Sequence, residues 1–201
     1  GGGGKGVISR RHASSPPRRS GLPAATCALL ALCAPAALAG DLLAHSRAIA
    51  DDFQQQLGGQ LKSAMAEGGP VAAIEVCAEV APQIASRASA DAGARVGRTA
   101  LRVRNPDNAP DADAAQVLQA FAERVAAGAS MPIEHLGTAP DGGTRYMRAI
   151  VLQPLCATCH GASLAPAVAD AVGARYPRDQ AVGFEIGELR GAFVIDWPVE
   201  D

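Results

Sequence analysis

The chain has 201 residues, with 18 lysines and arginines against 20 aspartates and glutamates and a formal net charge of −2 at pH 7. The charges are unevenly placed: residues 1–39 hold five bases and no acid, so residues 40–201 carry 13 bases, 20 acids and a formal charge of −7. A segment this acidic is not expected to bind nucleic acid or an anionic membrane surface.

Residues 1–39 have the layout of an export signal. Five basic residues between positions 5 and 19 precede an apolar run over residues 22–38, which ends in an A-x-A pattern before Gly40. The run is short and contains two prolines, whereas a transmembrane helix needs about 20 apolar residues. We therefore predict cleavage near Ala39/Gly40, a periplasmic location, no stable membrane insertion and one domain over residues 40–201.

The domain is predicted to begin with two helices. Apolar periodicity predicts a helix over residues 42–66, which Gly68-Gly69 ends. A second helix runs from Pro70 to about Ala88, with Pro82 kinking it or ending its regular part. Its apolar face points Cys77 inward, and its acids point to solvent. The face consists of Ile74, Cys77, Ala81 and Ile84, and the acids are Glu75 and Glu79.

The rest of the chain is predicted to be mostly strands. Residues 95–104 alternate as a strand with Leu101 and Val103 on one face, and a loop over residues 105–110 leads to a helix over residues 114–127 capped by Asp111 or Asp113. The later elements follow in order: a strand over 145–153, a helix over 164–172, an irregular segment over 176–187 and a strand over 188–197. Helices followed by separated strands predict an α+β fold rather than an all-helical one.

Cys156-Ala157-Thr158-Cys159-His160 is a haem attachment motif of the c type. Two thiols one helical turn apart can each add to a haem vinyl group, and the same turn brings the histidine to the iron. The alternatives are a thiol redox protein and half of a zinc ribbon. Zinc would need a second ligand pair, for which only scattered residues remain, and the flanking residues do not suggest the βαβ unit of a thioredoxin. The scattered residues are Cys77, His45 and His135.

Cys77 is the cysteine that neither this motif nor the export signal accounts for, since Cys27 and Cys33 lie within the signal. From the residues alone it is equally a buried structural cysteine or an iron ligand. If Cys77 is not the sixth iron ligand, that position is either open or occupied by another side chain. The candidate side chains are Met65, Met131, Met147, His45 and His135. Met147 is more typical of a core residue, and both histidines are expected to be solvated.

Four ordered blocks of residues resemble the Tll0287-like haem domain family. They are Ala73-Ile74-Glu75-Val76-Cys77 with Ala81-Pro82; Gly97-Arg98-Thr99 with Arg104-Asn105-Pro106 and Asn108-Ala109-Pro110-Asp111; Cys156-x-x-Cys159-His160-Gly161; and Tyr176-Pro177-x-Asp179-x-Ala181-x-Gly183 with Gly187-x-x-Arg190-Gly191-Ala192. The last block departs in detail, at Glu188 and Ala192-Phe193-Val194, but not at a ligand.

The resemblance implies a PAS-like α+β domain in which an antiparallel sheet and N-terminal helices carry one covalent haem c. By position it implies that His160 is the proximal iron ligand and Cys77 the distal one. Related domains precede signalling domains as sensor modules, and the physiological role of the family is unknown.

A thiolate ligand stabilises ferric iron, so a low potential is expected. The first predicted function is a periplasmic electron carrier with transient redox partners, and the alternative is a redox or small-ligand sensor that acts on a separate signalling partner. No acid or base groups mark an enzyme near the motif. Four arginines are expected either to pair with haem propionates or to form a solvated strand face. They are Arg98, Arg102, Arg104 and Arg148.

Overall fold

The computed structural model describes residues 1–4, 6 and 34–199. The chain divides into two units, Gly1–Ala37 and Leu38–Asp201, and the second contains the fold. Most of the predicted export signal, including Cys27 and Cys33, lies outside the described residues, so the cleavage site and the domain boundaries stay predictions. None of the helices in the described part is long and apolar enough to cross a membrane.

The two predicted N-terminal helices are present, with a sharp break between them. Helix α1 spans Ala34–Glu75 and is interrupted at Gly69, whose φ of 72° and ψ of −167° are not helical. A positive φ is easily reached only by glycine, and Pro70 then starts the next helical segment with a favourable φ. Helix α2, Ala81–Ala92, continues it.

A π-helical turn, η1, occupies Val76–Val80 between α1 and α2 and carries Cys77. In this turn the Ala81 N–H donates to the Val76 carbonyl, five residues earlier. Pro82 directly follows and cannot donate a backbone hydrogen bond to the preceding turn. Regular α-helix is therefore interrupted just before Pro82, as predicted, and π-turns of this kind are frequent at functional sites.

Four antiparallel strands form one sheet in the order β1-β4-β3-β2. Their bounds are β1 Arg95–Thr99, β2 Glu134–Thr138, β3 Thr144–Val151 and β4 Leu189–Trp197. The α+β prediction is confirmed. Sequence reasoning missed β2, which lies in a segment taken for a linker, because its residues have no apolar alternation and most of them are exposed.

The predicted strand over residues 95–104 was too long. The chain leaves the sheet after Thr99, whose hydroxyl donates to the Asn108 carbonyl. Leu101 is 42% exposed instead of lying on a buried face. Arg104 turns inward and binds Asp179. Polar contacts therefore outweigh the alternating pattern over the second half of this segment.

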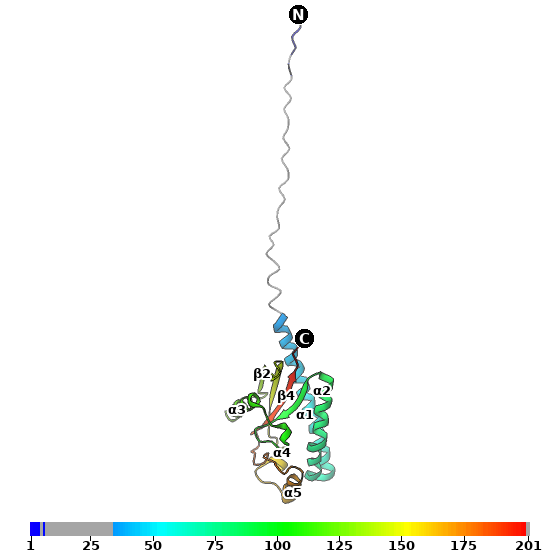
Figure 1. The fold of residues 1–201 in the computed structure, drawn as a ribbon, viewed down its shortest axis with the longest axis vertical. Helices are drawn as coiled ribbons and strands as arrows, with labels where there is room; N and C mark the ends of the chain where they lie inside the picture. The colour runs from blue at the N-terminus through cyan, green and yellow to red at the C-terminus, as the bar shows by residue number, and fades with distance from the viewer. Residues whose placement is uncertain (5, 7–33, 200–201) are drawn as a thin grey trace. The chain divides into compact units, whose positions relative to one another are not determined.

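Helices cover both faces of the sheet (Figure 1). Phe53 of α1 and Ile84 of α2 pack with Phe193 and Ile195 of β4 on one face. On the other face, α3 packs Leu118 and its neighbours against the alternate side of β3 and β4. Both sides of β4 are thus buried, which explains its nearly continuous apolar sequence.

The remaining helices follow the sequence predictions closely. Helix α3 spans Ala112–Ala126, and the Asp111 side chain caps it by accepting from the Ala114 N–H. The loop before it contains a short 3-10 helix, η2, Pro106–Asn108. Helices α4, Pro154–His160, and α5, Pro166–Arg175, lie together at one end of the domain (Figure 1). Arg175 of α5 pairs with the exposed acids Glu75 and Glu79.

A buried ion pair joins β3 to β4 and is expected to matter for stability. Arg145 donates to both carboxylate oxygens of Asp196, at 2.7 and 2.9 Å, and also binds Asp111. Burial alone would raise the pKa of Asp196, but the hydrogen bonds from Arg145 and Arg95 hold it below its usual value. Asp196→Asn is expected to cost about 3 kcal/mol, because it leaves Arg145 buried with only Asp111 as an ionic partner.

The lowered pKa of Asp196 makes its contribution to stability depend on pH. A carboxylate with a depressed native pKa contributes its full stability above its unfolded value of about 3.9, and loses it as the pH falls through the native pKa. The stability gap between wild type and Asp196→Asn should therefore shrink below about pH 4 in urea denaturation. Glu188→Gln removes an exposed ion pair with Arg102 and keeps a side-chain oxygen that can accept from the Glu185 N–H, so it is the control and should cost less than about 1 kcal/mol. Equal costs for the two variants would refute this prediction.

Candidate haem site

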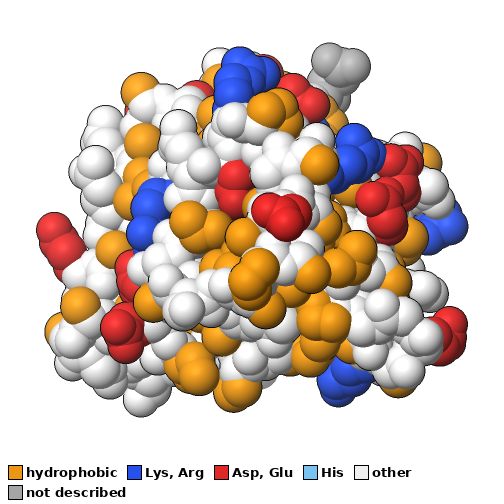
Figure 2. Space-filling model, turned by 90° about the horizontal axis from the view of Figure 1, so that it is seen from below, with side chains coloured by type: hydrophobic (Ala, Val, Ile, Leu, Met, Phe, Trp, Pro, Cys, Tyr) orange, Lys and Arg blue, Asp and Glu red, His pale blue; other side chains and the backbone are white. Residues whose placement is uncertain are grey.

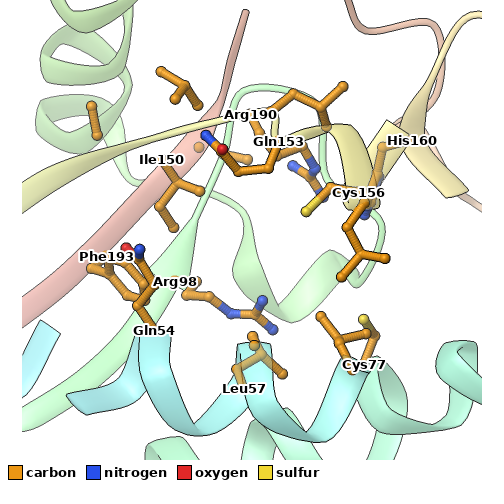
Figure 3. Close-up of a pocket in the computed structure, with 18 of the residues that line it drawn as sticks. Gln54, Leu57, Cys77, Arg98, Ile150, Gln153, Cys156, His160, Arg190 and Phe193 are labelled. Carbon is orange, nitrogen blue, oxygen red and sulfur yellow. The ribbon is translucent and has the colours of Figure 1, made fainter. Parts of the chain in front are cut away.

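A cavity of about 1280 Å³ lies between the N-terminal helices, the sheet and α4. Ordinary small-molecule pockets measure roughly 300–1,000 Å³, so this one has room for an unusually large ligand. It brings together all four residues predicted to bind haem. Its wall includes Cys77, Cys156, Cys159 and His160, and in the close-up Cys77 lies on the side opposite Cys156 and His160 (Figure 3).

Helix α4 positions the two cysteines of the motif. Gln153 is extended and Pro154 begins the helix, so the chain turns from β3 directly into α4. Cys159 packs beside the apolar cluster of Ile74, Val168 and Val172, while Cys156 packs beside another cluster that contains Phe184. Both cysteines are half-buried and line the cavity.

His160 is oriented by its backbone surroundings. Its Nδ1 lies 2.6 Å from the Ala181 carbonyl oxygen, and because a carbonyl only accepts, Nδ1 carries the proton. Nε2 is then left with its lone pair, as an iron ligand requires. Burial lowers the pKa of His160 to about 2, with a further contribution from Arg190 and Arg104, so the ring stays neutral.

Gly161 allows the chain to leave α4 immediately after His160. A Cβ at this position would lie 2.5 Å from the Ala157 carbonyl oxygen, which is too close for any side chain. The chain then runs beside the segment after α5, where the Phe184 N–H donates to the His160 carbonyl at 3.0 Å. The Gly183 N–H also donates to the Gly161 carbonyl at 2.9 Å, so these two backbone hydrogen bonds and the contact of the His160 ring fix the end of α4.

Cys77 faces the cavity from the π-helical turn η1. Burial raises the pKa of its thiol, and the nearby guanidinium groups of Arg98, Arg104 and Arg190 oppose this rise. The structure confirms the inward orientation of Cys77 that the helical pattern predicts. A ferric ion would favour the deprotonated thiol still further, since coordination removes the proton.

Only two of the other candidates for the sixth iron position line the cavity. Met147 is fully buried in the core beneath α3, and neither it nor His45 or His135 is among the residues that line the cavity. Both histidines are exposed, as expected. Met65 and Met131 do line the cavity.

The zinc and thioredoxin alternatives find no support in the described part of the chain. It holds no group of three or more His, Cys, Asp or Glu side chains placed to bind a metal ion. The motif follows β3, but the next strand, β4, is antiparallel to it, so the βαβ unit of a thioredoxin is absent there.

Three of the four predicted arginines line the cavity: Arg98, Arg104 and Arg148. Arg102 does not; its side chain donates to the Val182 carbonyl and to Glu188 at the surface. Arg102 lies beyond the end of β1, so it does not belong to a solvated strand face either; it is half-buried over the Phe184 ring. Sequence reasoning overlooked Arg190, which lines the cavity from β4 and could have been recognised only from its place beside Gly191 in the last family block.

The polar groups of the cavity fit an anionic ligand. The Nε atoms of Arg104 and Arg190 are buried without a hydrogen-bond partner among the described residues. Buried donors are nearly always satisfied, so an unpaired guanidinium nitrogen indicates a missing acceptor. A haem, whose apolar ring carries two carboxylates, satisfies both the size and the charge of this cavity, so the residues present fit the group.

The end of the domain that carries α4 and α5 shows apolar side chains gathered on its surface (Figure 2). In α4, Leu155 is 36% exposed while the adjacent Cys156 lines the cavity. Leu155 lines the cavity as well, so α4 contributes both to the cavity wall and to the surface of the domain. Val182 and Ile186, in the segment before β4, are also exposed.

Fold and site together define an α+β domain in which N-terminal helices, an antiparallel sheet and a short cysteine-bearing helix enclose one large cavity. The sequence matches the Tll0287-like family over residues 35–198, and the chain belongs to that family. It is similar to the crystal structure of the cyanobacterial heme-protein Tll0287, with 28% identity, a TM-score of 0.62 and coverage of 80% of this chain and 96% of that one. No curated protein matches the chain.

Proposed function

We propose that the protein is a monohaem cytochrome of the c type. Cys156 and Cys159 form the thioethers, His160 is the proximal iron ligand and Cys77 the distal one. The observation that carries the proposal is that Cys77, 79 residues before the motif, faces His160 across a cavity of about 1280 Å³. The similarity to a heme-protein with the same fold supports it.

The proposed activity is electron transfer at low potential. The haem supplies the redox couple, and the chain sets its potential and its access. An anionic thiolate at Cys77 stabilises the ferric state, and the neutral His160 ring adds no charge. Helix α4 brings the attachment site within one helix of the surface, where transient redox partners can approach.

The proposed location is the periplasm, reached through the predicted export signal, and the PAS-like description belongs to this proposal as well. Thioether attachment of haem is expected outside the cytoplasm, which agrees with the basic and apolar layout of residues 1–39. We propose no enzymatic activity, because both axial positions are assigned to side chains.

His160→Ala is expected to remove the proximal ligand without removing the haem. The thioethers depend on Cys156 and Cys159, so covalent haem persists while the ferric spin state changes. Optical spectra of the purified holoprotein test this, with His135→Ala as an exposed control that changes nothing. A wild-type ferric spectrum in His160→Ala would exclude His160 as a ligand.

One observation favours a redox or small-ligand sensor as the alternative function. A second cavity, of about 320 Å³, also reaches Cys77 and shares Arg98 and Thr99 with the first. Cys77 therefore borders a second space, and in this alternative its thiol leaves the iron towards that space on reduction. Cys77 also lies in a π-helical turn, a feature that is frequent at functional sites.

A potential titration with optical spectra, with and without carbon monoxide, separates the two functions. Reversible cycling without carbon monoxide binding supports the electron carrier. Loss of the Cys77 ligand on reduction, with carbon monoxide taking its place, supports the sensor and a signalling partner.

A further inference from the structure

We propose that Arg98 and Arg190 form a carboxylate-binding site in the cavity wall and that they bind the haem propionates. The inference rests on the proposed haem binding. It assigns a role to Arg190, which the sequence did not single out, and separates two arginines from the others near the cavity.

Arg98 has no carboxylate partner among the described residues, and the acidic groups that act on its charge from the cavity wall are cysteine thiols such as Cys77 and the Tyr176 hydroxyl. It extends into the cavity on the side of Leu57 and Cys77 (Figure 3). Among the described residues no carboxylate lies within ion-pair distance of it, and its closest aromatic contact is the Phe53 ring, 5.5 Å from its Cζ. Burial among the protein atoms lowers the pKa of the Arg98 guanidinium, although the half-buried side chain faces the cavity. A guanidinium so placed needs an anionic partner.

Arg190 is in a similar position on β4. Its Nη1 donates to the Arg102 carbonyl at 3.2 Å, but its Nε is buried and unpaired, and no carboxylate of the described residues forms an ion pair with it. Burial, followed by repulsion from Arg104 and Arg98, lowers its pKa to about 10. Anions bound at Arg98 and at Arg190, which line the same cavity, would relieve that repulsion.

The neighbouring arginines already have partners. Arg104 has a carboxylate partner, since its Nη2 donates to Asp179 at 3.0 Å and to the Cys159 carbonyl at 2.6 Å, and only its Nε is left unpaired. Arg148 binds Asp51.

The carboxylates that line the cavity already form ion pairs with other arginines. Glu134 lines the cavity but binds Arg47. Asp51 is held by Arg148. The carboxylates that line the cavity in the described part of the chain are therefore not free to bind Arg98 or Arg190, and a bound ligand would supply the carboxylates. Carboxylate matches the planar fork of guanidinium, which favours a propionate over a neutral group.

The resonance Raman bending band of the haem propionates tests the site in the intact holoprotein. A hydrogen-bonded propionate bends at higher frequency than a free one. Arg98→Gln and Arg190→Gln should each shift the band to lower frequency and lower the midpoint potential, because a positive charge near the iron is lost. Arg98→Lys and Arg190→Lys keep the charge, so they should shift the band while largely retaining the potential.

Arg102→Gln is the matched control. Arg102, like Arg190, lies over the Phe184 ring, but it does not line the cavity, so the band and the potential should stay as in wild type. A band that is unchanged in all four Arg98 and Arg190 variants would overturn the carboxylate site alone. Mass spectrometry separates this from failure of the proposed function: absence of covalent haem from the wild-type protein would overturn both.

Discussion

Replacing Cys77 with serine or alanine is expected to raise the midpoint potential by on the order of 0.1 V, within the roughly 0.8 V range that axial ligands span. The physical reason is that an anionic ligand stabilises ferric iron, and its loss leaves a neutral or open position. The ferric spectrum should change and the iron should bind exogenous ligands. Covalent attachment through Cys156 and Cys159 should survive, since these residues lie on α4 and Cys77 lies on another element, the π-helical turn η1.

The matched control is Met147→Leu. Met147 was a candidate for the same iron position, but it lies buried in the core beneath α3 and is not part of the cavity wall. Its replacement should leave the spectrum and potential unchanged. If Cys77→Ser kept both wild-type properties, Cys77 would be a core residue only, and the methionines of the cavity wall, Met65 and Met131, would be the next candidates.

Removing both motif thiols is expected to abolish covalent haem altogether. Each thioether needs one cysteine, so the Cys156→Ala, Cys159→Ala double variant should contain either no haem or haem that acid acetone extracts. The wild-type protein should keep its haem under the same extraction. The expected loss is complete, because the described part of the chain has Cys77 as its only other cysteine, and Cys77 faces the cavity from the opposite wall.

The intact mass of the purified proteins measures this directly. Cys77→Ser, expressed in the same way, is the control that retains both attachment thiols and should gain the mass of one haem. A covalent haem in normal stoichiometry in the double variant would refute c-type attachment.

Much of the fold follows from local sequence signals. Gly69, Pro70 and Pro82 mark where the helices break, because their backbone requirements do not depend on distant contacts. Asp111 marks the start of α3 for the same reason. The end of β1 could not be predicted, because it depends on the contacts of Arg104 with Asp179 and with the Cys159 carbonyl, which are distant in the sequence.

For the site, too, the local features were predicted from the sequence and the long-range ones were not. The motif at residues 156–160 is local, so its chemistry can be derived from spacing alone. The position of Cys77 opposite it is a tertiary relation that only the family resemblance implied. Arg190 escaped attention because an arginine within an apolar strand looks like an isolated surface residue until the cavity beside it is known. The ligand roles of His160 and Cys77 stay predictions.

X-ray absorption at the iron edge of the ferric holoprotein tests the central claim most directly, because it counts the sulfur atoms bound to iron. One sulfur ligand is expected in the wild-type protein and in Met147→Leu, and none in Cys77→Ser. The absence of sulfur from the wild-type iron shell, or its persistence in Cys77→Ser, would contradict coordination by His160 and Cys77.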